Sequence, residues 1–335
     1  MSGQRAQGAG IIGVGAAVPP RAVSNHDLVK QGLDTSDEWI RTRTGISERH
    51  IADAEICSSD LAAAAGRAAL ANAGLSPQDI DLIIVSTSTP DHPLFPSTAS
   101  AVQHKLGCRK VGAFDLSAAC SGFVYGITVG DQFIRSGQCR YVLVIGVDIL
   151  SRWVDWKDRG ICVLFGDGAG AAVLGPCADG HGCLYTQLGA DGSGGAMLCT
   201  PAGGTKEPST AETLASGRQF IRMDGKAVFK FASQVIIETA QTALAKCGLE
   251  VSDLRLFIPH QANERITQHA IARLGLKPEQ VASNISRYGN TSAASIPLAL
   301  DEYKTQLKDG DVLMLLGFGA GLTWGVNVIR WGGRL

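Results

Sequence analysis

The stretch Ala69-Leu-Ala-Asn-Ala-Gly-Leu-Ser-Pro-Gln-Asp-Ile-Asp-Leu-Ile-Ile84 occurs a second time, in weakly similar form, as Ala243-Leu-Ala-Lys-Cys-Gly-Leu-Glu-Val-Ser-Asp-Leu-Arg-Leu-Phe-Ile258. Both copies read as the end of a helix, a glycine at its C-cap, a turn and an apolar strand. A chain that repeats such a unit is expected to fold as two similar halves.

The similarity extends beyond the repeated stretch. In each half there follow a helical pattern ending in Leu-Gly, a strand that starts at a valine, a second helical run, a strongly apolar strand and a last strand. The matching positions are Leu106-Gly107 and Leu274-Gly275, Val111 and Val281, 141–145 and 312–316, and 169–174 and 325–329. We therefore predict an α/β fold in which each half has the order β-α-β-α-β-α-β-β, with mostly parallel sheets covered on both faces.

The halves are expected to divide into residues 1–180 and 181–335. Residues 181–225 are rich in Gly, Ser, Thr and Pro, and we interpret them as the loop that joins the halves. A second loop-rich insertion, residues 34–59, carries Trp39 and several arginines.

Composition limits the possible functions. The 335 residues have a formal net charge of −1, so there is no broad basic surface for nucleic acid. No apolar run approaches the roughly 18 residues of a membrane span, and we expect a soluble cytoplasmic protein. The nine cysteines include no C-x-x-C pair, so we expect no zinc or other metal site. The glycine content, 41 residues, is typical of an α/β enzyme with tight turns.

One cysteine is placed where a nucleophile would be. In Val111-Gly-Ala-Phe-Asp-Leu-Ser-Ala-Ala-Cys120-Ser-Gly-Phe-Val-Tyr-Gly126, a strand runs into small residues and then a helical pattern. This order predicts that Cys120 lies in the first turn of a helix, where the helix dipole lowers a thiol pKa and free N–H groups hold an oxyanion. The alternative is an ordinary small core residue.

Two further residues occupy comparable positions. His260 follows the strand 254–258, and Asn290 comes nine residues after Val281, as Cys120 comes nine after Val111. Reactive groups collect at the carboxyl ends of strands in such sheets. If the halves pack about a pseudo-twofold axis, Cys120, His260 and Asn290 meet in one cavity. Taken singly, His260 could be a core histidine and Asn290 a turn residue.

Longer motifs carry a family resemblance over almost the whole chain, from Ile11 to Arg330. They are Asp34-Thr-Ser-Asp-Glu-Trp-Ile-Arg-Thr-Arg-Thr-Gly45, Asp158-Arg-Gly160, Phe165-Gly-Asp-Gly-Ala-Gly-Ala-Ala172, Pro259-His-Gln-Ala-Asn263 and Gly289-Asn-Thr-Ser-Ala-Ala-Ser295. The chain resembles the β-ketoacyl-acyl carrier protein synthase III family of the thiolase superfamily. The resemblance implies a thiolase-like fold, a five-layered α-β-α-β-α sandwich.

The resemblance also implies a reaction. It is the decarboxylative Claisen condensation of an acyl-CoA starter, with acetyl-CoA favoured, and malonyl-acyl carrier protein, which initiates type II fatty-acid synthesis by a ping-pong mechanism. Cys120 would be acylated, while His260 and Asn290 would bind the malonyl thioester carbonyl and stabilise the enolate. The N–H groups of Cys120 and Ala320 would form the oxyanion hole, although many relatives have glycine at the position of Ala320.

Binding residues follow from the same resemblance. Those for coenzyme A are Thr35, Trp39, Arg43, Arg159, Gly225 and Asn263. The residues that would dock the acidic carrier protein are Lys230, Arg265 and Arg273. The alternative interpretation is that they are ordinary solvated surface charges. Those of the acyl pocket are Phe95, Leu150, Phe165 and Phe318, with Phe95 reaching across a homodimer interface. No cofactor is implied, since acyl-CoA is a substrate.

Related classes fit less well. Thiolases need a second cysteine in the C-terminal glycine loop, and Gly317-Phe-Gly-Ala-Gly321 has none. Elongating ketosynthases use two histidines, whereas the second position here is Asn290. An acyltransferase or condensing enzyme of a polyketide or quinolone-type pathway remains an alternative. A non-catalytic carrier-binding protein is disfavoured because Cys120, His260 and Asn290 are all present.

Overall fold

Two mixed β-sheets form the centre of the molecule in a computed structural model that describes residues 8–335. The first sheet has the order β1-β7-β6-β4-β5, and the second has the order β8-β13-β12-β11. In the first sheet the strands are β1 (Gly8–Ala17), β4 (Leu82–Ser86), β5 (Gly112–Leu116), β6 (Val142–Ile149) and β7 (Asp167–Cys177). In the second they are β8 (Gly182–Ala190), β11 (Leu254–Pro259), β12 (Val312–Gly319) and β13 (Thr323–Arg330). Corresponding strands occupy corresponding places, as the sequence repeat predicts.

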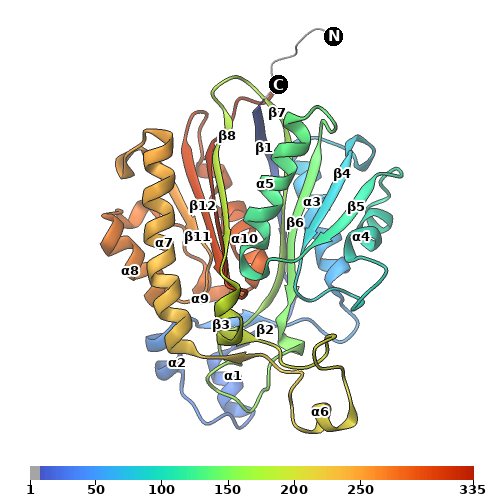
Figure 1. Cartoon of the computed structure of the whole chain (residues 1–335), viewed down its shortest axis with the longest axis vertical. Helices are drawn as coiled ribbons and strands as arrows, with labels where there is room; N and C mark the ends of the chain where they lie inside the picture. The colour runs from blue at the N-terminus through green and yellow to red at the C-terminus, as the bar shows by residue number, and fades with distance from the viewer. Residues whose placement is uncertain (1–7) are drawn as a thin grey trace.

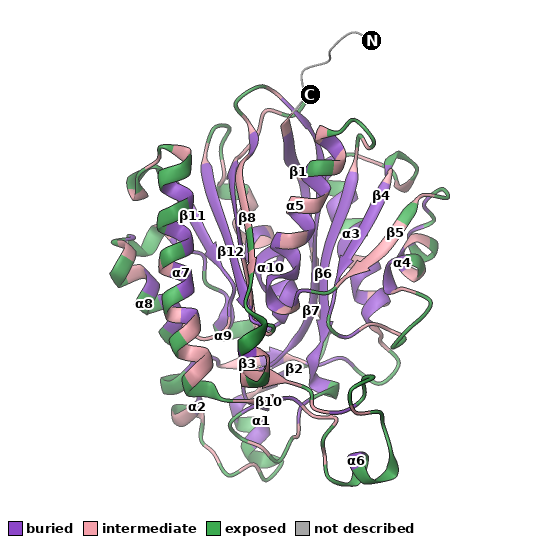
Figure 2. Cartoon of the chain, in the orientation of Figure 1, coloured by how far each residue is buried: buried purple, intermediate pink, exposed green. Residues whose placement is uncertain are grey.

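Helices complete five layers (Figure 1). The central layer contains α5 (Gly122–Arg135) and α10 (Ser295–Tyr303), between the two sheets. The outer layers are α3 (Ser58–Ala73) with α4 (Thr98–Leu106), and α7 (Gly225–Cys247) with α8 (Glu264–Leu274). Figure 2 shows the sheets and the central helices largely buried, while the outer helices expose one side. Three apolar clusters fill the spaces between successive layers, so the expected sandwich is confirmed.

The predicted insertion and the residues before it form a cap below the sheets. The cap consists of β2 (Ala22–Ser24) and α1 (Asn25–Lys30), which precede the insertion, and of α2 (Asp37–Thr44) and β3 (Glu48–His50) within it. A fourth apolar cluster joins β2, α1 and α2. Arg49 is fully buried there and donates hydrogen bonds to the carbonyls of Val23 and Val163, at 3.1 and 2.9 Å. The predicted loop-rich insertion at 34–59 therefore also contains a helix that sequence reasoning did not predict, because Ser36 caps α2, whose buried side includes Ile40.

The sheets are less parallel than predicted. Among the named strands of residues 8–335, only the pairs β4–β5, β4–β6 and β11–β12 are parallel, because β7 and β13 return beside their predecessors without a crossover helix. The strand expected at Val281 is reduced to a single bridge with Phe257.

The segment 181–225 is also more ordered than a joining loop. It contains β8, the short strands β9 (Leu198–Cys199) and β10 (Arg222–Met223), and α6 (Ala211–Ala215). The proposed division after residue 180 falls between β7 of the first sheet and β8 of the second. The first seven residues of the proposed N-terminal half lie outside the described part of the chain.

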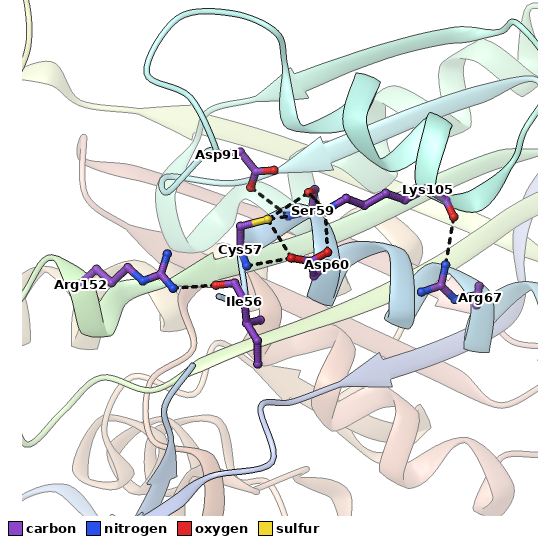
Figure 3. A network of polar contacts seen from close by, with 8 residues as sticks. All are labelled: Ile56, Cys57, Ser59, Asp60, Arg67, Asp91, Lys105 and Arg152. Atoms are coloured by element: carbon purple, nitrogen blue, oxygen red, sulfur yellow. Dashed lines mark hydrogen bonds and ion pairs between the residues drawn. The ribbon is translucent and has the colours of Figure 1, made fainter. Parts of the chain in front are cut away.

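A polar network fixes the start of α3 and the loop before α4 (Figure 3). Asp60 accepts a hydrogen bond from the Cys57 N–H, and Lys105 of α4 donates to Asp60 and to Ser59, at 2.6 and 2.7 Å. Asp91 accepts from the Ser59 N–H at 3.0 Å. The loop that connects β4 to α4 is thereby held, at Asp91 near the middle of the loop, against the start of α3.

Candidate active site

Cys120 lies in a short 3₁₀ turn, Ala119–Ser121, after β5. The α-helix α5 begins only at Gly122, so the prediction that Cys120 occupies its first turn was wrong by two residues. Ala119 adopts a left-handed conformation with φ 47°, and Gly289, which precedes Asn290, has φ 64°. In both loops the residue immediately before Cys120 or Asn290 therefore has a positive φ. Strained backbone at a non-glycine residue such as Ala119 is concentrated at functional sites.

The three predicted residues meet in one cavity. Cys120, His260 and Asn290 all line a cavity of about 720 Å³ between the sheets and the cap. His260 follows β11, and Asn290 precedes the 3₁₀ turn Ser292–Ala294 that leads into α10. The three side chains are buried, with exposed fractions of 8%, 2% and 7%. The geometry is that expected for two similar halves packed face to face.

His260 is held as a neutral imidazole. Its Nδ1 lies 2.6 Å from the Ser295 hydroxyl, and its ring packs edge-on against Phe318 with ring centroids 5.1 Å apart. Burial lowers the pKa of His260 to about 3, so the ring is uncharged near pH 7. When the Ser295 hydroxyl donates to Nδ1, the remaining ring nitrogen, Nε2, carries the proton and is a hydrogen-bond donor.

The carboxamide of Asn290 is oriented by its own loop. Its Oδ1 accepts a hydrogen bond from the Ser292 N–H at 2.9 Å. The Nδ2 group is then left to donate a hydrogen bond elsewhere. Asn290 and His260 can therefore present two neutral donors to one site in the cavity.

The thiol of Cys120 is protonated near pH 7. Burial, with a smaller contribution from the nearby Asp148 carboxyl, raises the pKa of Cys120 to about 12, although the Ser292 side chain acts in the opposite direction. The predicted lowering of the thiol pKa was therefore wrong. The physical reason is that removal from water disfavours the thiolate more than the displaced helix end can favour it.

The candidate oxyanion hole lies where β12 meets the Cys120 loop. Gly319 is packed so closely that an added Cβ would lie 2.8 Å from the Cys120 nitrogen, and the following residue, Ala320, lines a cavity with Cys120. The Ser121 hydroxyl contacts the Ala118 carbonyl of its own loop and the Thr323 hydroxyl at the start of β13, both at 2.7 Å. The Cys120 and Ala320 N–H groups, the two proposed donors, thus lie in segments that pack directly against each other.

A second cavity, of about 320 Å³, lies on another side of Cys120. Leu150 and Phe165, two of the four predicted acyl-pocket residues, line it. Phe318 instead lines the first cavity, beside His260. Phe95 is 81% exposed on the β4–α4 loop and lines neither cavity within this chain.

The predicted coenzyme A residues gather at the opening of the first cavity. Trp39, Arg43, Gly225 and Asn263 line it, whereas Thr35 and Arg159 do not. The guanidinium groups of Arg43 and Arg159 lie 5.0 and 5.3 Å from the Trp39 ring centroid. An aromatic face with two cations suits an adenine and its phosphates.

The predicted carrier-docking residues are exposed beside this opening. Lys230 lies on α7, and Arg265 and Arg273 lie on α8, which packs against α7. Of the three exposed basic residues, Arg265 is the one that borders the cavity.

Sequence reasoning missed several polar residues around the catalytic set. Ser292 and Ser295 lie within a motif that was noticed only for Asn290, and Asp148 lies in a strand whose eight residues are all buried. An acidic residue inside the run Tyr141 to Leu150 was the available signal for Asp148. Within residues 8–335 there is no group of three or more His, Cys, Asp or Glu side chains able to hold a metal ion. No helix in that range has the length and apolar character to span a membrane.

Comparisons with known proteins agree with this geometry. Residues 114–192 match the family described as 3-oxoacyl-[acyl-carrier-protein] synthase III, and residues 244–331 match the C-terminal part of the same family. The β-ketoacyl-[acyl-carrier-protein] synthase III of Symbiobacterium thermophilum is 53% identical over 96% of this chain and 98% of its own length. This chain belongs to the β-ketoacyl-[acyl-carrier-protein] synthase III family. It is accordingly a condensing enzyme, an acyltransferase of fatty-acid biosynthesis.

Solved structures of the synthase III family show the same fold. The enzyme of Aquifex aeolicus has a TM-score of 0.88 at 44% identity, covering 97% of this chain and all of its own. The priming β-ketosynthase of the R1128 polyketide pathway has a TM-score of 0.91 at 36% identity, covering 100% of this chain and 99% of its own. The family therefore includes close structural relatives whose pathway differs.

Proposed function

We propose that this synthase condenses an acyl-CoA starter with malonyl-acyl carrier protein to give 3-ketoacyl-acyl carrier protein, CO2 and coenzyme A. The observation that carries the proposal is the meeting of Cys120, His260 and Asn290 in one cavity, with a second cavity beyond the thiol. A buried nucleophile between two cavities can receive an acyl group from one side and store it on the other. Two half-reactions at one sulfur give ping-pong kinetics.

In the first half-reaction, the Cys120 sulfur attacks the thioester carbonyl. The negative charge on the carbonyl oxygen is received by the N–H groups of Cys120 and Ala320, and coenzyme A leaves as the thiol. The acyl chain then occupies the cavity lined by Leu150 and Phe165.

In the second half-reaction, His260 and Asn290 bind the malonyl thioester carbonyl. Loss of CO2 places negative charge on that oxygen, and the resulting enolate carbon attacks the acyl-cysteine. Neutral donors already fixed by Ser295 and Ser292 need no reorganisation. Removing one such donor typically costs about 3–4 kcal/mol of transition-state stabilisation.

The substrates are held by the residues at the opening. Trp39, Arg43, Arg159, Gly225 and Asn263 would bind coenzyme A, and Thr35 would act from the edge of the site. Lys230, Arg265 and Arg273 would attract the acidic carrier protein. Acyl-CoA is a substrate in this scheme, so the reaction as proposed uses no cofactor.

We also propose that the enzyme is a cytoplasmic homodimer. The edge strand β5 is only partly buried, and Leu94 and Phe95 are 80% and 81% exposed on the neighbouring loop. A contact that pairs this edge with a second copy would cover both residues and bring Phe95 to the partner's acyl cavity. A cytoplasmic location fits a protein with nine free thiols that consumes acyl-CoA.

A second candidate function is the priming of a polyketide or other secondary pathway. It is favoured by the likeness to the R1128 priming enzyme. The chemistry at Cys120 would be the same, so the two functions are distinguished by which carrier protein supports turnover. Parallel assays with malonyl-loaded fatty-acid and polyketide carrier proteins decide between them.

The test of the proposed function begins with acetyl-CoA and malonyl-carrier protein. The acyl mass should be found on Cys120, and a 3-ketoacyl product should follow. Cys120→Ala should abolish both, whereas Cys199→Ala, which removes another thiol of the second cavity, should still be acylated on Cys120. Normal turnover by Cys120→Ala would overturn the mechanism. His260→Ala and Asn290→Ala should form the acyl-enzyme but lose decarboxylation.

A further inference from the structure

A buried carboxyl group lies beside the catalytic cavity and has no role in the steps above. Asp148 belongs to β6 and is completely buried. Its hydrogen-bond donors are hydroxyl and backbone N–H groups, all of them neutral. A buried carboxyl without a basic partner is energetically costly, so its position in an apolar strand points to a function.

The two oxygens of Asp148 differ in their surroundings. Oδ1 accepts hydrogen bonds from the Ser88 and Thr89 N–H groups, at 2.7 and 3.1 Å, and from the Thr87 and Thr89 hydroxyls, at 3.2 and 3.0 Å. These two hydroxyls in turn accept from the N–H groups of Thr89 and Ile149, so their protons are directed at Asp148. Four donors leave Oδ1 no room for a proton of its own.

The other oxygen faces the catalytic loops. Oδ2 accepts the Ala293 N–H at 3.3 Å. The preceding residue, Ser292, lowers the pKa of both the Asp148 carboxyl and the Cys120 thiol through its side chain. Cys120 and Ser292 also line the same 320 Å³ cavity. Ser292 is therefore the side chain placed between the sulfur and the buried carboxyl.

We propose that Ser292 and Asp148 form a proton relay that removes the thiol proton of Cys120 during acylation, an inference that rests on the proposed function. As the sulfur–carbonyl bond forms, the thiol proton passes to Ser292 Oγ, and the Ser292 proton passes to Asp148 Oδ2. When the bond to coenzyme A breaks, its sulfur takes up one proton and Asp148 returns to the carboxylate. In this relay Ser292 exchanges the proton with the sulfur directly, and Asp148 acts through Ser292.

The electrostatics favour this route over proton transfer to His260. Burial raises the pKa of Asp148 above the usual range of a carboxyl, whereas it lowers the pKa of His260 to about 3. Asp148 is thus a stronger base than an exposed carboxylate, and the imidazole is a weak one. A separate relay also leaves His260 neutral, as the donor that the second half-reaction needs.

The experiment separates the two half-reactions in rapid-quench measurements on the full-length enzyme. Acylation is followed by mass with acetyl-CoA alone, and condensation is followed as a single turnover of pre-acylated enzyme with malonyl-carrier protein. Ser292→Ala, which keeps the Cβ and removes only the hydroxyl, should slow acylation by about 100-fold or more and leave condensation near the wild-type rate. Asp148→Asn should show the same selectivity.

The matched control is Ser295→Ala, which removes the hydroxyl beside His260 and should slow condensation rather than acylation. In mixtures of H2O and D2O, the wild-type acylation rate should follow a curved proton inventory, because two protons move together. Acylation of Ser292→Ala at the wild-type rate, equal slowing of both steps in that variant, or a linear inventory would each overturn the relay. A wild-type enzyme that is never acylated at Cys120 would instead overturn the proposed function.

Discussion

At the scale of single residues, Cys120 and His260 are both uncharged near pH 7. Burial lowers the pKa of the His260 imidazole to about 3 and raises that of the Cys120 thiol to about 12. A catalytic imidazole that cannot be protonated near pH 7 acts as a hydrogen-bond donor in the enolate step. Its uncharged state is maintained at a cost in stability that depends on pH.

That cost gives a prediction for acid stability. The unfolded chain binds a proton at His260 near its ordinary pKa of 6.5, while the folded state binds it only near 3. The folded state is therefore progressively destabilised as the pH falls below 6.5, by about 2 kcal/mol at pH 5 from this group. Between pH 7 and pH 5, the free energy of unfolding measured in urea titrations should fall in both proteins. The fall should be about 2 kcal/mol smaller for His260→Gln than for the wild type. The exposed His104→Gln is the control and should behave as wild type; identical losses in all three proteins would contradict the buried neutral state.

At the scale of elements, the catalytic loops are supported by direct backbone contact. A Cβ added at Gly146 of β6 would lie 2.2 Å from the Ala293 carbonyl oxygen, whereas one at Gly192 would meet nothing within 4 Å. Gly146→Ala should therefore lower the free energy of unfolding by about 1–3 kcal/mol and displace the loop that carries Asn290. Acylation and condensation should both fall in single-turnover assays, because the displaced loop carries Ser292 as well as Asn290, and Gly192→Ala should change neither. A Gly146→Ala enzyme with unchanged condensation would show that the Asn290 loop does not depend on this contact.

The same scale shows what sequence patterns can and cannot establish. The repeated stretches correctly predict β4 and β11, because an apolar run after a glycine-capped helix is a local signal. The pattern at Val281 predicts a strand equally well, yet only one bridge to Phe257 forms, since strand pairing depends on neighbours that the local sequence does not specify. The prediction of a lowered pKa for Cys120 was wrong for a similar reason, because the burial of the thiol depends on how the two halves assemble. Asp148 and Ser292 contact each other only after β6 and the Asn290 loop are brought together.

At the scale of the whole molecule, the duplication places a single thiol between two cavities of different character. The larger, about 720 Å³, is lined at its opening by Trp39 and Arg43, and the smaller, about 320 Å³, is lined by Leu150 and Phe165. A methylene group is about as large as a water molecule, which occupies roughly 30 Å³ in the liquid. An acetyl group would fill only a small part of the second cavity, so the chain should also accept longer starters.

This argument leads to a test of starter selection. With acyl-CoA primers of increasing length, the wild type should be acylated by acetyl and by medium-length chains. Leu150→Trp places an indole in the second cavity and should retain acetyl transfer while reducing transfer of the longer chains at least tenfold, because chains that no longer fit lose their apolar contacts. Leu214→Trp makes the same substitution on α6, where Leu214 is 52% exposed and lines neither cavity, and should keep the wild-type profile. If the wild type takes acetyl alone, the second cavity is closed in the working enzyme, which is the result expected if the proposed homodimer brings Phe95 of a second copy to this cavity.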